Sequence, residues 1–354
     1  MNREKTRDLL IMHYRTYPNL QIRDIFKYLY QSAFGCEHLV SSYAGAVEYI
    51  EKEYASLSDD NVETLDVLDG EYCRIPLSYL KNGLGAETFG KFFCASSKKE
   101  PGGKARLEEM LSVAKDMINE KALPFSTDEF ENAVTAWKTN GYPPVRHSEI
   151  FRESYKPSYR VISNEYARLL PLLVEIDKKL RGGSAVVAIE GGSASGKTTL
   201  GETLSALYDC TVLHMDDFFL RPEQRTKERY AEVGGNVDRE RFLEEVLIPL
   251  GKNQPIDYRR FNCSTMTIDP ALKIIPKKLT VIEGAYSMHP ELSSYYDLSL
   301  FLDIAPDQKK KRIAKRNSPQ MAERFYNEWI PLERLYFSQM NVKERCDLSL
   351  DICE

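Results

Sequence analysis

The sequence predicts an α/β fold for the C-terminal half of the chain, with a parallel sheet covered by helices on both faces, preceded by a mainly α-helical N-terminal half. After residue 184, short apolar runs typical of strands alternate with amphipathic helical patterns, and this alternation is typical of parallel sheets. A glycine-rich loop directly follows the first of these strands. The first 180 residues instead show helical periodicity, most clearly in the segment 163–180.

The N-terminal half is expected to be built mainly from helices. Helical patterns lie near 3–16, 21–34, 44–55, 86–96, 104–120, 127–139 and 163–180. One or two short strands are expected within 66–80. The glycine-rich segment 181–184 breaks the last helix, so we place the domain boundary there. This divides the chain into a mainly helical domain of unknown role, 1–180, and an α/β domain, 181–354.

One N-terminal segment, 147–160, is dense in polar and aromatic side chains. Such a segment suits either a surface that faces a ligand or a surface that packs between domains. Packing is the favoured interpretation, because this half of the chain matches no family pattern that we recognise.

The C-terminal half is expected to alternate strands and helices. The expected strands are 185–190, 211–215, 279–283, 298–303 and 348–352, and the expected helices are 198–208, 239–250, 306–316 and 326–340. Ligands of such sheets bind beyond the carboxyl ends of the strands. The residues that end strands 185–190, 211–215 and 279–283 are therefore expected to converge on one site.

The overall composition excludes several classes of protein. A formal net charge of −5 argues against a surface that binds DNA or RNA. Seven scattered cysteines without a C-x-x-C pair indicate neither a disulfide framework nor a zinc ribbon, and they suit a reducing cytoplasm. The first residues are too charged for a signal peptide, and no apolar run approaches the roughly 20 residues that span a bilayer. We expect a soluble cytoplasmic protein without nucleic-acid or membrane partners, and a homo-oligomer is compatible with the sequence.

The glycine-rich loop reads Gly-Gly-Ser-Ala-Ser-Gly-Lys-Thr over residues 191–198, which fits the phosphate-binding pattern G-x-x-x-x-G-K-[ST]. Glycines let the backbone wrap so that its N–H groups point at phosphate oxygens, and the following helix adds its positive end. Lys197 is expected to reach the β- and γ-phosphates, and the Thr198 hydroxyl to coordinate Mg²⁺. The expected nucleotide-binding residues are Gly191, Gly192, Ser193, Ala194, Ser195, Gly196, Lys197, Thr198 and Thr199.

Carboxylates follow two further strands of the predicted sheet. Asp216 and Asp217 come after strand 211–215, where a carboxylate can orient an acceptor hydroxyl and take its proton during phosphoryl transfer. Glu283 ends strand 279–283 and is suited to Mg²⁺ or to a water that binds it. Phosphate, base and metal functions thus come from three strands.

These motifs resemble the uridine kinase and phosphoribulokinase-like group of P-loop kinases, which includes the nicotinamide riboside kinases. The resemblance covers about residues 185–340. It rests on the P-loop, on Met-Asp-Asp-Phe-Phe at 215–219, on Asn-Val-Asp at 236–238 and on Ile-Glu-Gly at 282–284. It implies the P-loop NTPase fold, with Asp216 as the catalytic base and Asp238 as a ligand of sugar hydroxyls on the acceptor. Asp217 is then a neighbour whose part in the reaction stays open.

Residues 255–261 are similar to the acceptor-binding segment of that family, and Tyr258, Arg259 and Phe261 are the expected substrate contacts. The segment lacks the tyrosine-aspartate-phenylalanine and following histidine of uridine kinases, so the acceptor is left open. Residues 309–316 resemble the lid helix. Because Arg312 and Arg316 are four residues apart, they share one helical face and are expected to act catalytically on the triphosphate, with Lys197 and Asp216. A part for Arg324 stays open.

The sequence thus favours an ATP- and Mg²⁺-dependent kinase that transfers a γ-phosphoryl group to a hydroxyl of a nucleoside or related sugar-bearing small molecule. Thr198 and Glu283 are the expected metal ligands. The alternative is an ATP-binding regulatory or interaction protein in which the P-loop domain switches the helical domain. A signalling GTPase is excluded, because no Asn-Lys-x-Asp motif follows the P-loop.

Overall fold

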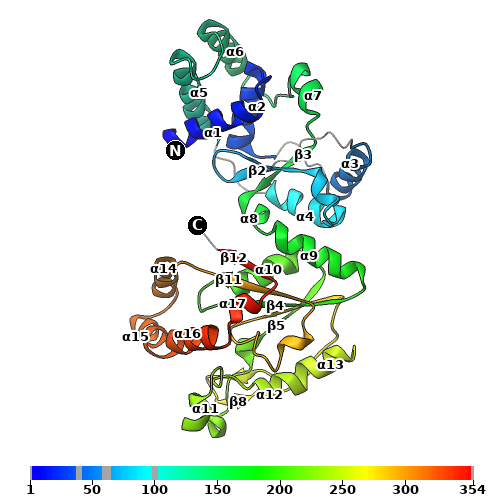
Figure 1. Ribbon diagram of the computed structural model, residues 1–354, viewed down its shortest axis with the longest axis vertical. Helices are drawn as coiled ribbons and strands as arrows, with labels where there is room; N and C mark the ends of the chain where they lie inside the picture. Colours follow the sequence, from blue (N-terminus) through cyan, green and yellow to red (C-terminus); the bar gives the residue numbers. More distant parts are fainter. Residues whose placement is uncertain (1, 37–41, 58–64, 98–102, 352–354) are drawn as a thin grey trace. The chain divides into compact units, whose positions relative to one another are not determined.

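The computed structural model describes residues 2–36, 42–57, 65–97 and 103–351, which form two compact units, Met1–Leu170 and Pro171–Glu354. Figure 1 shows the helices and strands of each unit. The division falls at the start of helix α9 (Leu170–Arg181), whereas the sequence boundary was placed after that helix. The Tyr208 hydroxyl donates to Asp177 Oδ1 at 3.0 Å, which ties α9 to the second unit.

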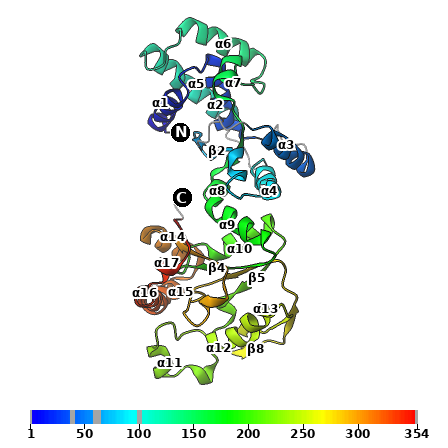
Figure 2. The same cartoon turned by 45° about the vertical axis from the view of Figure 1, so that its right-hand side comes forward.

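The first unit surrounds a short antiparallel sheet with helices. Its strands, in the order β1-β2-β3, are Asp66–Val67, Tyr72–Pro76 and Tyr159–Ser163. Its helices are α1 (Arg3–Thr16), α2 (Ile22–Phe34), α3 (Tyr43–Ala55), α4 (Ala86–Ser96), α5 (Gly103–Asn119), α6 (Thr127–Thr139), α7 (Glu149–Tyr155) and α8 (Asn164–Ala167). Helix α5 packs on α1, α2 and α6, while α4 packs on α3 and β3 (Figure 2).

Three features in and at the end of the first unit differ from the sequence expectation. The segment 147–160 contains helix α7 and the start of strand β3, neither of which was expected. Strand β3 is stabilised by its antiparallel pairing with β2, which is distant in sequence and gives no local signal. The expected helix 163–180 is divided into α8 and α9.

The second unit contains a five-stranded parallel sheet in the order β12-β11-β4-β10-β5. The strands are β4 (Ala185–Glu190), β5 (Cys210–His214), β10 (Leu279–Glu283), β11 (Leu298–Asp303) and β12 (Leu348–Asp351). This confirms the predicted fold class and all five predicted strands. Because β10 pairs with both β4 and β5, Glu283 lies level with Ile189 on one side and His214 on the other. The carboxyl ends of three strands therefore meet.

Helices cover both faces of this sheet, with α9 and α10 on one side and α12 and α13 on the other (Figure 1). The helices after α9 are α10 (Lys197–Leu207), α11 (Lys227–Ala231), α12 (Arg239–Phe242), α13 (Ile248–Gly251), α14 (Pro306–Arg316), α15 (Pro319–Arg324), α16 (Ile330–Gln339) and α17 (Val342–Arg345). Two small antiparallel pairs flank them, β6 (Ile256–Tyr258) with β9 (Leu272–Ile274) and β7 (Phe261–Asn262) with β8 (Thr267–Ile268).

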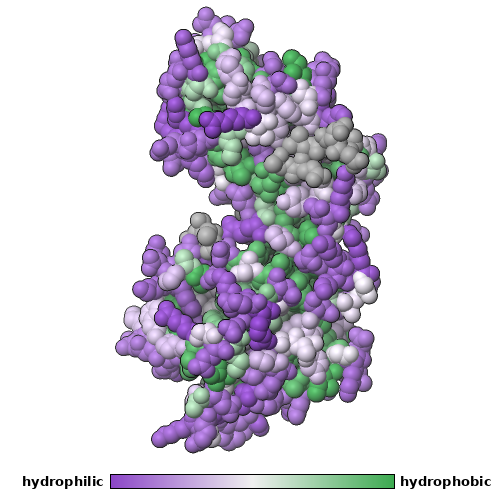
Figure 3. Space-filling view, viewed as in Figure 1, coloured by the Kyte–Doolittle hydropathy of each residue, from purple (hydrophilic) through white to green (hydrophobic). Residues whose placement is uncertain are grey.

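Hydrophilic side chains cover most of the face of each unit that Figure 3 shows. Within the described ranges, no helix has both the length and the apolar character needed to cross a bilayer.

Candidate active site

The P-loop connects the end of β4 to the start of α10, and its course requires glycine at two points. Gly191 has φ +152°, and a Cβ added there would lie 2.5 Å from the carbonyl oxygen of Leu302. Gly196 has φ +100° directly before the helix begins at Lys197. Both conformations disfavour other residues, so these glycines fix the path of the loop around an anion site.

Lys197 is buried inside the loop, with 8% of its surface exposed. Its Nζ donates to the carbonyl oxygens of Gly191 at 2.8 Å and Gly192 at 3.1 Å. The ammonium group is thereby held at the centre of the loop, at the positive end of α10. This is the position from which a P-loop lysine neutralises nucleotide phosphates.

Glu283 links the P-loop helix to strand β5. Its Oε1 accepts hydrogen bonds from Thr198 Oγ1 at 3.1 Å and lies 2.6 Å from His214 Nδ1. The hydrogen bond to Glu283 is the main cause that raises the pKa of His214. A hydroxyl and a carboxylate side by side at the phosphate site are oxygen ligands of the type Mg²⁺ prefers, so the predicted ligands Thr198 and Glu283 fit that ion.

Asp216 lies one turn beyond strand β5, on the short helical turn Met215–Asp217. Desolvation raises the pKa of Asp216, the charges of Glu283 and Glu333 add to this, and Lys197 opposes it. Asp216 is exposed at the surface, so the surrounding protein atoms desolvate the carboxylate only on the side that faces the site. Asp217 instead accepts a 2.7 Å hydrogen bond from the Tyr258 hydroxyl. The two adjacent carboxylates therefore differ, one facing the site and one tied to the core.

A cleft of about 470 Å³ is lined by Asp238, Arg241, Arg259 and other charged side chains. One of them, Arg241, donates through Nη2 to the carbonyl oxygen of Asp217 at 3.3 Å. Asp238 is 1% exposed and caps helix α12 by accepting from the Arg241 amide at 3.3 Å. Its Oδ2 pairs with two arginines, lying 3.4 Å from Arg241 Nε and 3.7 Å from Arg221 Nε. A buried carboxylate flanked by arginines at a cleft offers both acceptors and donors to a hydroxyl-bearing ligand.

The expected acceptor contacts separate into two groups. Arg259 lines the cleft, where its guanidinium pairs with Glu245. Tyr258 and Phe261 are 4% and 5% exposed and belong to the core, because Tyr258 points inward from strand β6 onto Phe218. Ligand contact through these rings stays a prediction, and the Tyr258 hydroxyl positions Asp217.

The arginines predicted from the lid helix and the segment after it have different contacts. Arg312 Nη1 donates to the carbonyl oxygen of Ala194 at 3.3 Å, which brings α14 onto the P-loop. The Arg316 guanidinium lies over the ring of Phe325 at 5.9 Å and is exposed. Arg324 pairs with Glu328 on its own helix. Of the three, Arg312 alone is seen to contact the loop in the described structure.

Glu333 of helix α16 is a site residue that sequence reasoning missed. Its Oε1 accepts from the Ser193 amide at 2.9 Å and from the Ser193 hydroxyl, and its Oε2 lies 3.1 Å from Lys309 Nζ. Only 3% of the residue is exposed. A carboxylate is therefore held by a P-loop N–H group of the kind that binds phosphate. Nothing in a helical pattern at 326–340 predicts which acidic residue folds back onto the loop.

Glu190 is a second missed residue, at the end of β4 and fully buried. It accepts from the amides of Gly191 at 2.9 Å, Tyr286 at 3.2 Å and Met288 at 3.0 Å, and from the Tyr336 hydroxyl at 3.1 Å. Burial raises the pKa of Glu190 to about 7, although the amides of Met288 and Gly191 oppose this. The one available signal was a carboxylate ending an otherwise apolar strand.

Residues 186–327 match the sequence profile of the Phosphoribulokinase / Uridine kinase family. The C-terminal unit carries a domain of this family. A curated relative, the phosphoribulokinase of Synechocystis sp. (strain ATCC 27184 / PCC 6803 / Kazusa), is 28% identical over 147 residues, or 39% of this chain. The matched segment spans 42% of that relative's length. The domain is thus a nucleotide-binding P-loop domain of the kinase type.

Solved structures similar to this unit include a possible uridine kinase from Bacillus stearothermophilus, with 21% identity and a TM-score of 0.37. That match covers 51% of this chain and 100% of the other. A putative fructose transport system kinase from Silicibacter sp. TM1040 has 22% identity and a TM-score of 0.40, covering 47% of this chain and 89% of the other.

The position of Glu333 leads to a prediction about nucleotide affinity. Glu333→Gln keeps an oxygen acceptor but removes the charge that competes with phosphate for the Ser193 amide. We expect ATP with Mg²⁺ to bind about tenfold more tightly to this variant in titration calorimetry, the scale of one charge-assisted hydrogen bond. Glu328→Gln, at an exposed carboxylate paired with Arg324, is the matched control and should bind like the parent. Unchanged or weaker binding by Glu333→Gln would contradict the competition.

The position of Glu190 leads to a prediction about stability. The raised pKa means that the Glu190 carboxyl binds its proton more tightly in the folded state than in the unfolded state. Protonated Glu190 therefore contributes its full stabilisation below the ordinary glutamate pKa of 4.5, and this contribution is lost as the pH rises to about 7. The loss amounts to about 3 kcal/mol. Urea unfolding of the second unit, followed by the fluorescence of Trp329 in a Trp137→Phe background, should show this decline in the parent and in the exposed variant Glu202→Gln, but not in Glu190→Gln. The same decline in all three proteins would refute it.

Proposed function

We propose that this protein is an ATP-dependent small-molecule kinase that transfers the γ-phosphoryl group to a hydroxyl of a nucleoside or related sugar-bearing metabolite. The observation that carries the proposal is the convergence of Lys197, Asp216 and Glu283 at the ends of neighbouring strands. Glu283 accepts from Thr198, the residue after Lys197, and lies 2.6 Å from His214 Nδ1, two residues before Asp216. A switch needs the phosphate site but not a carboxylate beside an acceptor cleft.

Each residue has a distinct part in the proposed reaction. The P-loop amides and Lys197 hold the phosphates, and Arg312 approaches from the lid helix. Thr198 and Glu283 would hold Mg²⁺, which supplies positive charge to the phosphate oxygens when bound. Asp216 orients the acceptor hydroxyl and takes its proton as the new P–O bond forms. Positioning and charge neutralisation thus account for most of the catalysis.

The cleft lined by Asp238, Arg241 and Arg259 supports a polar, hydroxyl-bearing acceptor. Asp238 offers a buried carboxylate oxygen, and Arg241 and Arg259 offer N–H donors. Arg241 is itself fixed by its bond to the Arg259 carbonyl oxygen. Vicinal hydroxyls of a sugar suit this mixture of acceptor and donors, whereas an apolar acceptor would make no polar contact with it.

The proposal is tested by acceptor-dependent turnover. The intact chain is incubated with ATP and Mg²⁺ and with nucleosides, nicotinamide riboside, glycerate or pantothenate, and ADP release is measured for each. We expect ADP release to rise well above the acceptor-free rate with at least one sugar-bearing acceptor. Hydrolysis at one rate across a broad panel would favour the regulatory alternative.

The role of Asp216 is tested by a matched pair of variants. Asp216→Asn should keep ATP binding but lose phosphoryl transfer by about 10² to 10⁴, because the amide cannot take the proton. Asp217→Asn should retain most of the activity, since the amide oxygen can still accept from Tyr258. The raised pKa of Asp216 also predicts that activity falls on the acid side at a higher pH than for an ordinary aspartate. Full transfer by Asp216→Asn would exclude it as the base.

A further inference from the structure

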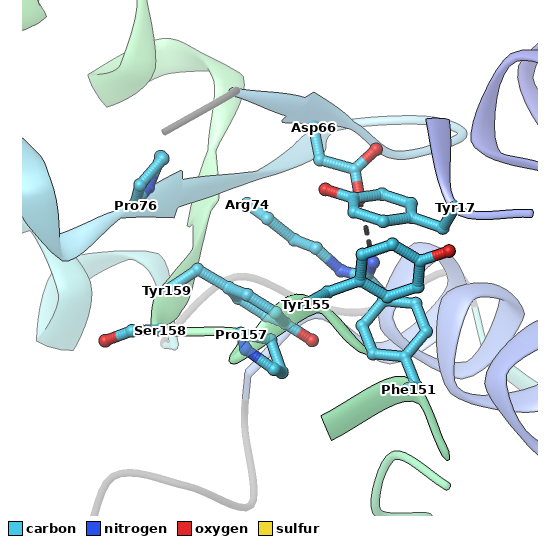
Figure 4. Close-up of a pocket in the computed structure, with 9 residues that line it drawn as sticks. All are labelled: Tyr17, Asp66, Arg74, Pro76, Phe151, Tyr155, Pro157, Ser158 and Tyr159. Carbon is cyan, nitrogen blue, oxygen red and sulfur yellow. Dashed lines mark hydrogen bonds and ion pairs between the residues drawn. The ribbon is translucent and has the colours of Figure 1, made fainter. Parts of the chain in front are cut away.

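The first unit contains a buried arginine at the base of a small crevice (Figure 4). Arg74 lies on strand β2 and is 2% exposed. The rings of Tyr17, Phe151, Tyr155 and Tyr159 line the crevice around its guanidinium group. Three of these rings come from the segment 147–160, which therefore packs within its own unit.

The guanidinium group of Arg74 is held rigidly but keeps one free donor. Its Nε donates to Gln31 Oε1 and its Nη1 to Asp66 Oδ2, each at 2.8 Å. The rings of Tyr28 and Tyr159 lie 5.5 and 4.8 Å from its central carbon. Its Nη2 has no hydrogen-bond partner within the described ranges. Burying such a donor unpaired costs about 1–3 kcal/mol, so the site favours an acceptor there.

A chain of hydrogen bonds fixes the wall of the crevice. The Tyr159 hydroxyl lies 2.7 Å from His147 Nε2, and His147 Nδ1 lies 2.9 Å from Asp24 Oδ1. Burial lowers the pKa of His147 to about 3, so the ring is neutral and donates through Nδ1 to Asp24. Its Nε2 then accepts from Tyr159. The ring beneath Arg74 is therefore preorganised, as a binding site requires.

The charges around Arg74 favour a neutral acceptor over an anion. Asp66 pairs with the Arg74 guanidinium at 2.8 Å and neutralises its charge. Burial acts to raise the pKa of Asp66, but Arg74 and His13 outweigh burial and lower it, so this carboxylate is charged. Burial lowers the pKa of His13, which leaves that ring uncharged. Lys27 and Asp24 add one charge of each sign. An anion would lose its hydration without meeting a net positive charge.

The mouth of the crevice is aromatic. The ring of Tyr17 lies 5.1 Å from that of Phe151 and 5.0 Å from that of Tyr155, and the Tyr155 hydroxyl accepts from the Asn19 amide at 2.8 Å. The enclosed space of about 20 Å³ admits a single oxygen atom, the size of one water. A ligand would therefore place one oxygen inside and its body against the half-buried ring of Tyr155, because Tyr17 and Phe151 are only 7% and 1% exposed.

We propose that the first unit binds a planar, uncharged amide or carbonyl compound, with its oxygen on Arg74 Nη2 and its ring against Tyr155 at the rim of the crevice. This assigns a small-molecule site to the helical half of the chain, independent of the nucleotide site. Rigid aromatic walls with one oriented donor are typical of small-molecule sites.

The test uses three probes with the same ring, namely benzamide, benzoate and toluene. Ligand-observed saturation-transfer NMR on the full chain gives their dissociation constants. We expect benzamide to bind about tenfold more tightly than toluene, because it alone pairs with the donor without a charge. Equal binding of benzamide and toluene, tighter binding of benzoate, or binding of no probe would overturn the proposal. The last result would leave a crevice filled by a structural water.

Two sets of variants separate binding from folding. Arg74→Lys keeps a charge opposite Asp66 but removes Nη2, and it should weaken benzamide about tenfold while leaving toluene unchanged. Tyr155→Phe keeps the mouth ring and should bind benzamide like the parent, whereas Tyr155→Ala should bind it several-fold more weakly. If Arg74→Lys does not fold, the Tyr155 pair decides, and equal benzamide binding by both would overturn the proposal.

Discussion

The buried carboxylate of Glu190 is the interaction on which the nucleotide site depends. It joins the first amide of the P-loop, the loop that follows Glu283 and the helix that carries Glu333, through Gly191, Tyr286, Met288 and Tyr336. These elements are distant in sequence. Parallel pairing of the strands fixes where each strand ends, but it does not fix the loops that follow the strands. One residue thereby fixes the loop against its two neighbouring elements, at the cost of a buried charge.

In the resulting site, the groups expected to bind phosphate are already paired with other groups of the protein. Lys197 donates to carbonyl oxygens of its own loop, and Glu333 accepts from a loop amide while Lys309 neutralises it. Nucleotide phosphates would replace these internal partners with charged ones. The affinity for nucleotide then depends on the difference in free energy between the loop with its internal partners and the loop with bound phosphates. Glu333, although distant in sequence from the P-loop, can therefore change this affinity.

The sequence was informative where the chemistry is local. The five apolar strands and the P-loop are short continuous patterns, and the structure places them as expected. Strand β3, Glu333 and the crevice at Arg74 depend on contacts between distant segments, which periodicity does not encode. Tyr258 and Phe261 are instructive, because aromatic rings near a predicted site suggested ligand contacts, whereas the short strands β6 and β7 turn them into the core. Arg312 and Arg316 are four residues apart on one helix, but Arg312 contacts the P-loop whereas Arg316 packs on Phe325. The spacing of the two arginines does not predict this difference.

The central claim is that Glu190 holds the P-loop to the loop after β10. Amide hydrogen exchange at Gly191 and Met288 tests it most directly, because both N–H groups donate to this carboxylate. In the parent we expect protection comparable to that of the sheet amides, and in Glu190→Ala at least tenfold faster exchange at both sites, with the amides of β12 unchanged. Equal exchange in the two proteins would show that the loops are held without Glu190 and would contradict the account.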